Sequence, residues 1–321
     1  MTAADSFACA PLLKTIARGA KGARPLSEDE TRALFDAILA DRVGPAELGG
    51  VLIAYRIKGE TPVELRAMLA AAHATFTPLN APADAPPPVV LPSYNGARKQ
   101  PNLTPLLALL LARDGIPALV HGQHHSGTHR VGTQAIFAAL GHPACQSGAE
   151  AETALRDRRV AYLPLNAISP PLERLLEMRA VLGVRNSGHT VVKLLQPFAS
   201  PALRLFNYTH PEYRETLTAM FSDPVDSPAP GVLLARGTEG EPVADARRQT
   251  AIDAFCEGKQ TTLVAADEGA VGTPPDLPAA DADSTARWIE SVLAGNTAVP
   301  LPIARQVAGI RSALGLPQAS A

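Results

Sequence analysis

One loop of this chain combines cations, amides and a single glycine where an α/β protein could hold phosphate. It covers residues 93–104, between a short apolar run and a helix-like run. At such a strand-to-helix turn, a glycine-rich loop can bind phosphate through its backbone N–H groups. Here the only glycine is Gly96, and Arg98 and Lys99 follow it. We therefore expect the loop to attract phosphate through these cations, but not to wrap it closely with backbone.

A second loop is rich in histidine. His121, His124, His125 and His129 lie within nine residues and are followed by Arg130. Two histidines four apart on a helix can share a metal, but the nearby glycines indicate a loop, and the cluster contains no carboxylate or cysteine. We predict no metal site and interpret the cluster as donors that face phosphate. Solvated loop residues without a ligand are the alternative.

A third group of polar and basic side chains lies in an otherwise apolar region. Its members are Arg185, Asn186, His189, Lys193 and Arg204. The three cations have no acidic residue nearby in the sequence, which favours contact with phosphate. A structural network of ion pairs or a dimer-facing surface is the alternative. Together with Asn102 of the first loop, the three groups form the predicted nucleic-acid-binding set, which has no catalytic member. We expect its cations to converge on one side of an α/β domain.

Composition limits the class of protein. With 46% hydrophobic and 19% charged residues over 321 positions, the chain can bury a sizeable core. No apolar run approaches the length of a membrane span, and no signal peptide is apparent. The three cysteines are far apart and match no metal-binding spacing. We predict a cytoplasmic protein with reduced thiols and no cofactor.

Capping signals near the start predict helices. Residues 27–30 read Ser-Glu-Asp-Glu and residues 61–64 read Thr-Pro-Val-Glu, and both have the spacing of a capping box. A helix between them is expected to end at Gly59. We predict a helical, dimerising domain over residues 1–77. A proline-rich linker over residues 78–92 is expected to follow.

Apolar runs alternate with helix-like segments in the rest of the chain. The runs cover residues 89–91, 118–120, 160–163 and 231–235. Short buried strands that alternate with helices are typical of a mainly parallel sheet covered on both faces. We therefore predict an α/β fold, with residues 93–321 forming an α/β domain that ends in helices.

Several runs resemble a known superfamily. Residues 56–64, Arg-Ile-Lys-Gly-Glu-Thr-Pro-Val-Glu, resemble the amino-terminal helical domain of anthranilate phosphoribosyltransferase, and the resemblance continues in order through His121-Gly122 and residues 194–197. Residues 186–190, Asn-Ser-Gly-His-Thr, are similar to the YbiB-type branch of this glycosyltransferase family 3 superfamily. The resemblance implies the nucleoside-phosphorylase/phosphoribosyltransferase fold. It also implies a homodimer joined through its helical domains, which binds DNA or RNA instead of serving tryptophan biosynthesis.

The chain departs from the transferase motifs at three places. The glycines and the acid of the first phosphate loop, G-T-G-G-D-G, are replaced, and Val120 stands where the family has a lysine that meets pyrophosphate. The magnesium-holding acidic pair is expected after Gly237, where this chain offers Glu239 and Glu241. Phosphoribosyl transfer needs backbone donors, a cation and magnesium together. We therefore expect no anthranilate phosphoribosyltransferase activity, with a transferase for another acceptor as the alternative.

Overall fold

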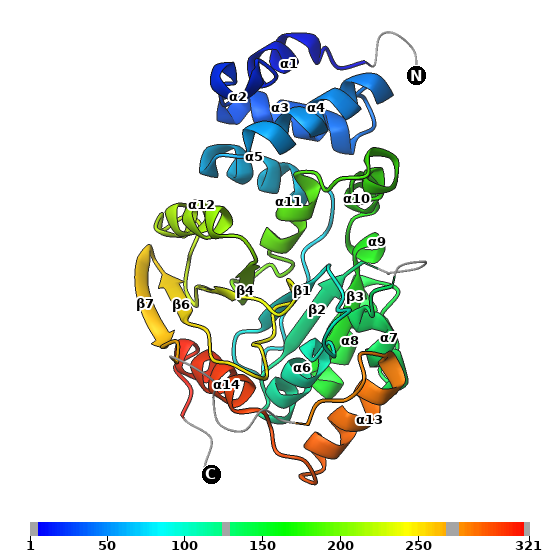
Figure 1. Ribbon diagram of the computed structural model, residues 1–321, viewed down its shortest axis with the longest axis vertical. Helices are drawn as coiled ribbons and strands as arrows, with labels where there is room; N and C mark the ends of the chain where they lie inside the picture. The colour runs from blue at the N-terminus through cyan, green and yellow to red at the C-terminus, as the bar shows by residue number, and fades with distance from the viewer. Residues whose placement is uncertain (1–5, 124–128, 268–275, 318–321) are drawn as a thin grey trace. The chain divides into compact units, whose positions relative to one another are not determined.

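The structure is a computed structural model that describes residues 6–123, 129–267 and 276–317 (Figure 1). It contains two compact units, described separately below. The helical unit comprises residues up to 77 together with residues 168–195, and the α/β unit comprises residues 78–167 and 196 onwards. The predicted division placed residues 168–195 in the α/β domain. The structure groups them with the helical unit, because they form helices that pack on its first helices.

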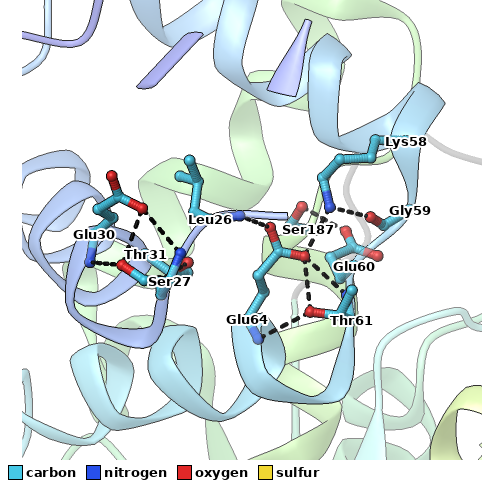
Figure 2. Close-up of polar contacts among 10 residues, drawn as sticks. All are labelled: Leu26, Ser27, Glu30, Thr31, Lys58, Gly59, Glu60, Thr61, Glu64 and Ser187. Atoms are coloured by element: carbon cyan, nitrogen blue, oxygen red, sulfur yellow. Dashed lines mark hydrogen bonds and ion pairs between the residues drawn. The ribbon is translucent and has the colours of Figure 1, made fainter. Parts of the chain in front are cut away.

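The described residues of the helical unit form seven helices. They are α1 (Ala10–Ile16), α2 (Gly19–Gly22), α3 (Glu28–Leu39), α4 (Pro45–Lys58), α5 (Pro62–His73), α10 (Pro170–Leu182) and α11 (Gly188–Leu194). Both predicted capping boxes are confirmed at the starts of α3 and α5 (Figure 2). Gly59 ends α4 with a φ of 78°, which suits glycine. α1 and α2, which precede the first capping box, were not predicted.

The α/β unit is built on a seven-stranded sheet with the order β3-β2-β1-β4-β5-β6-β7. The strands are β1 (Val89–Ser93), β2 (Ala118–Gly122), β3 (Val160–Pro164), β4 (Leu203–Tyr208), β5 (Val232–Arg236), β6 (Ile252–Cys256) and β7 (Lys259–Val264). The first five strands are parallel, and β6 and β7 continue the sheet in antiparallel fashion. The prediction of a mainly parallel sheet is confirmed. β4, β6 and β7 were not predicted.

Helices cover both faces of this sheet. They are α6 (Thr104–Arg113), α7 (Thr133–Ala139), α8 (Gly148–Arg158), α9 (Leu165–Ile168), α12 (Pro211–Phe221), α13 (Ala282–Leu293) and α14 (Leu301–Ala313). On one face, α6, α7, α13 and α14 share a core with Val89 and Leu91 of β1. On the other face Phe206 of β4 stacks on Phe221 of α12, with ring centroids 4.7 Å apart. Successive strand residues point to opposite faces, so each strand contributes to both cores.

The predicted linker differs from the structure at both ends. β1 begins at Val89, inside the segment predicted to be linker. Leu79 forms a parallel bridge with Phe198, in which its N–H donates to the Pro197 carbonyl at 2.8 Å. Residues 78–92 therefore belong to the α/β unit. Within the described ranges, no helix is both long and apolar enough to cross a lipid bilayer.

Candidate functional site

Loops from neighbouring strands meet at the carboxyl end of the parallel sheet. The strand order reverses between β1 and β4, and open α/β sheets bind ligands outside such a switch point. Residues 94–103, the β1 loop, and residues 237–250, the β5 loop, follow two strands that flank β4. Asn207 near the end of β4 donates its amide to the Gly240 carbonyl at 2.9 Å. This contact joins β4 to the β5 loop.

Glu241 of the β5 loop is held within the β1 loop. Its Oε1 accepts the backbone N–H groups of Asn95 and Gly96, both at 2.8 Å. Its Oε2 accepts the hydroxyls of Ser93 and, at 3.3 Å, Thr104. A carboxylate offers about four lone-pair positions. All four are used here, and the Glu241 side chain is buried, with 1% of the residue exposed.

Glu239 occupies the outer part of the same loop. Its carboxylate accepts the backbone N–H groups of Arg98, Lys99 and Gln100 at 3.1, 2.7 and 2.9 Å. The guanidinium of Arg130 lies 3.7 Å from Oε2. The β1 loop therefore directs three further backbone donors at a second carboxylate.

A tight turn delivers both carboxylates. Glu239 and Gly240 both have a positive φ, 51° and 89°, and the turn is closed by a bridge between Thr238 and Glu241. A Cβ at Gly240 would lie 1.5 Å from the side-chain nitrogen of Asn95, so only glycine fits there. This close approach explains how two glutamates that are two residues apart can enter one loop.

The β1 loop was expected not to wrap a phosphate closely with its backbone, and its backbone N–H groups hold two carboxylates of the chain instead. Five of its backbone N–H groups surround two carboxylates, with Gly96 in the left-handed region at a φ of 61°. The anions that it binds belong to the chain itself. Since Glu239 and Glu241 lie about 145 residues away in the sequence, no local pattern around the β1 loop could reveal this pairing.

The two glutamates do not fit the magnesium site that the family resemblance implies. Magnesium keeps several waters and is bound through carboxylates that face the ion. Glu241 is buried and faces four donors, and Glu239 faces three N–H groups and a guanidinium. Over the described ranges, no group of three or more His, Cys, Asp or Glu residues could hold a metal.

His121, at the end of β2, is buried beneath the β1 loop. Its ring has no exposed surface, and its Nδ1 lies 2.7 Å from the hydroxyl of Tyr94. Burial lowers the pKa of His121 to about 3, so the ring is neutral at physiological pH. Its Nε2 has no hydrogen-bond partner among the described residues. His121 was predicted to face phosphate. The structure buries it, so it presents no donor to a phosphate at the surface.

Asn102 has a structural role in the same layer. Its amide donates to the Thr133 hydroxyl at 2.8 Å, and its carbonyl oxygen accepts the N–H of Thr104 at 3.2 Å, where α6 begins. Only 2% of Asn102 is exposed, so its predicted surface contact with phosphate is not available. His124 and His125 lie outside the described residues, and His129 is exposed.

The backbone of the β1 loop faces the two carboxylates, but two of the cationic side chains in this region face solvent. The side chains of Arg98 and Lys99 are exposed and form no ion pair with a carboxylate of the described residues. Arg130 is engaged instead, because it donates to the Gly96 carbonyl at 2.9 Å as well as approaching Glu239. Of the predicted cations near this loop, Arg98 and Lys99 are thus the two that face solvent.

The third predicted group is divided between the two units. Arg185, Asn186, His189 and Lys193 belong to the helical unit and Arg204 to the α/β unit, so the predicted convergence on the α/β domain is wrong. Arg185 and Lys193 are half-buried. Arg204 is the second residue of β4, far from the strand's carboxyl end, and donates to the Asp226 carbonyl at 2.6 Å. Burial lowers its pKa to about 10.

Asn186 and His189 support the start of α11. The Asn186 amide donates to the Leu175 carbonyl at 2.8 Å, and its side-chain oxygen accepts the N–H of Gly188 at 2.9 Å. His189 is 8% exposed, and burial, aided by the positive charge of Arg185, lowers its pKa to about 3. These two residues thus hold local structure, in contrast with their predicted contact with phosphate.

Comparisons with known proteins agree with this architecture. Residues 10–75 match the helical bundle domain of the glycosyl transferase family. The uncharacterized protein YbiB of Escherichia coli K12 is 42% identical over 299 residues, covering 92% of this chain and 91% of YbiB. Anthranilate phosphoribosyltransferase of Methylobacterium radiotolerans is 28% identical over 280 residues, covering 85% of this chain and 78% of that enzyme.

Solved structures show the same fold at lower identity. Anthranilate phosphoribosyltransferase of Thermus thermophilus gives a TM-score of 0.69 at 22% identity, covering 94% of this chain and 89% of that one. The Saccharomyces cerevisiae enzyme in complex with PRPP and Mg gives 0.72 at 14% identity, covering 96% and 89%. A helical bundle with a mainly parallel α/β unit is thus confirmed as the fold. This chain shares the fold of the anthranilate phosphoribosyltransferases and carries the helical bundle of the glycosyl transferase family, and it belongs to the family of Escherichia coli YbiB.

Proposed function

We propose that this protein is a homodimer that binds nucleic acid through the sugar-phosphate backbone, largely without sequence preference. The β1 loop supports this proposal. Its backbone donors are taken by Glu239 and Glu241, whereas the side chains of Arg98 and Lys99 face solvent without a carboxylate partner in the described structure. Such a loop offers cations to an external phosphate, and contacts to phosphate carry affinity without reading sequence.

The same arrangement argues against anthranilate phosphoribosyl transfer. That reaction needs donors, a cation and magnesium placed where charge develops on the departing pyrophosphate. Here the donors already hold two carboxylates, which would repel a pyrophosphate in the same place. Val120, where the family has its lysine, is fully buried in β2. The protein therefore lacks the arrangement that would stabilise the transition state.

The helical unit supports the dimer. It exposes three large apolar side chains, Ile57 on α4, Val63 on α5 and Val181 at the end of α10, with 65%, 42% and 77% of each residue accessible. Contact with a second copy would remove these apolar groups from water. We expect light scattering at micromolar concentration to show a dimer. A monomer throughout that range would contradict this part of the proposal.

A paired substitution tests the role of the β1 loop. We expect Arg98→Ala/Lys99→Ala to weaken binding to unrelated DNA sequences to a similar degree. The slope of log affinity against log salt should shrink by roughly 0.7 per lost contact on single strands. Alanine keeps the backbone N–H groups that hold Glu239, so the loop itself should remain in place. Fluorescence anisotropy over a salt series measures both quantities.

The matched control is Arg247→Ala/Arg248→Ala. It also removes two adjacent cations, but both of these pair with Asp245, at 3.2 and 4.0 Å. It should keep the salt slope of the parent protein. If the folded Arg98/Lys99 variant instead retains full affinity and an unchanged slope, the β1 loop does not contact nucleic acid.

A further inference from the structure

Four cations lie on or next to the first two helices, with no acidic residue between them in the sequence. Lys14, Arg18, Lys21 and Arg24 are all exposed, and residues 6–27 contain no acidic residue. The hydrogen bonds that Arg18 and Arg24 donate go to backbone carbonyls. None of the four cations forms an ion pair with a carboxylate in the part of the chain that the structure describes. Four positive charges are therefore presented to solvent without an ion pair in the described structure.

Packing holds these two helices in place. α1 and α2 both pack on α4, and a Cβ at Gly50 of α4 would lie only 3.2 Å from the Leu13 side chain. Gly19, with a φ of 72°, allows the turn between the two helices. The N–H of Arg24 donates to the Thr15 carbonyl at 3.1 Å, so the end of α2 is tied back to α1. The cations therefore belong to a segment that is fixed in place because its apolar side packs on α4.

We infer that residues 10–24, the α1–α2 segment, form a second contact surface for the phosphate backbone of nucleic acid; this rests on the proposed function and adds a surface of the helical unit to the β1 loop. Exposed lysines and arginines that form no ion pair can each neutralise one phosphate and release its counterions. The whole chain has a formal charge of −2, so binding must come from local groups of this kind. By contrast, the half-buried Arg32 and Arg305 pair with carboxylates at 2.9 and 2.5 Å.

An anionic membrane is the other polyanion that such a surface could meet. Helices that bind membrane surfaces place large apolar side chains beside their cations, so that these side chains enter the lipid. The α1–α2 segment exposes no large apolar side chain: Ile16 is buried, and Leu12 and Leu13 are half-buried. Cations without an exposed apolar face favour nucleic acid over lipid.

The test compares two fourfold variants of the full chain. The first is Lys14→Ala/Arg18→Ala/Lys21→Ala/Arg24→Ala. The control, Arg32→Ala/Arg247→Ala/Arg248→Ala/Arg305→Ala, removes the same charge from exposed or half-buried arginines that are ion-paired. Anisotropy with a mixed-sequence single-stranded oligonucleotide is followed over a salt series. We expect the first variant to lose up to roughly 2.8 units of salt slope, about 0.7 for each contact, and the control to keep the parent slope.

A smaller variant guards against loss of folding. Lys14→Ala/Lys21→Ala removes two side chains that make no hydrogen bond in the described structure, and it should lose about half as much slope as the fourfold variant. An unchanged slope in the α1–α2 variants, or an equal loss in the control, overturns this inference while the proposed function stands. If the parent protein binds no oligonucleotide, both this inference and the proposed function are contradicted. If it binds phosphatidylserine vesicles through these cations instead, the partner is a membrane.

Discussion

Replacing Glu241 by alanine is expected to destabilise the α/β unit by about 2–6 kcal/mol. The substitution leaves the N–H groups of Asn95 and Gly96 buried without an acceptor, at about 1–3 kcal/mol each. The hydroxyl of Ser93 keeps a second partner, Thr133, and so adds less. Glu241 thus joins the β1 and β5 loops, and its loss should release both.

Trp288 gives a local signal for this effect. It is the single tryptophan of the chain and lies in α13 of the α/β unit. Thermal unfolding followed by its fluorescence should therefore shift to lower temperature in Glu241→Ala. Glu239→Ala is the control, because two of its three donors belong to exposed Arg98 and Lys99, whose N–H groups water can reach, and the third, Gln100, is only half-buried. An equal shift in both variants, or none in Glu241→Ala, would contradict the role assigned to Glu241.

Replacing Glu64 by alanine is expected to destabilise the helical unit by about 3–5 kcal/mol. Glu64 has no exposed surface, and it accepts hydrogen bonds from outside its capping box as well as within it (Figure 2). Its Oε1 accepts the N–H of Leu26 at 3.0 Å, and its Oε2 accepts Lys58 Nζ at 2.7 Å together with the N–H and hydroxyl of Thr61. Without this carboxylate, the nearly buried ammonium of Lys58 loses its anionic partner.

The second capping box provides the matched control. Glu30 makes the same contacts with Ser27 at the start of α3, but it is exposed and holds no cation (Figure 2). Glu30→Ala should therefore cause a much smaller loss of stability. Far-UV circular dichroism reports on the helices, and hydrogen exchange at the amides of Leu26 and Thr61 locates the opening. Similar losses in Glu64→Ala and Glu30→Ala would show that the buried contacts contribute little.

The sequence predicted the elements whose signals are local. Both capping boxes and four strands of the parallel sheet were predicted because side-chain spacing and apolar runs lie within a few residues of each other. β4 was missed because Arg204 and Asn207 interrupt its apolar pattern. β7 was missed because most of its side chains are exposed and polar, so its sequence carries no apolar pattern.

The candidate site was predicted less completely. The position of the β1 loop could be read from the order of the elements, but its partner could not, because Glu241 is distant in sequence. Asn102, His121 and His189 were predicted to face phosphate from their residue types. The structure buries them, because polar groups at the ends of strands and helices can satisfy one another. Residue type alone does not distinguish a buried donor from a ligand-facing one.

The most direct test of the proposed function is equilibrium binding of the parent protein to a mixed-sequence single-stranded oligonucleotide over a salt series, with PRPP and magnesium as competitors. The proposal predicts measurable binding whose logarithm falls linearly with log salt. PRPP with magnesium should compete no better than simple salt of equal ionic strength, because Glu239 and Glu241 hold the donors that it would need. Tight binding of PRPP, turnover when anthranilate is added and no affinity for the oligonucleotide would contradict the proposal.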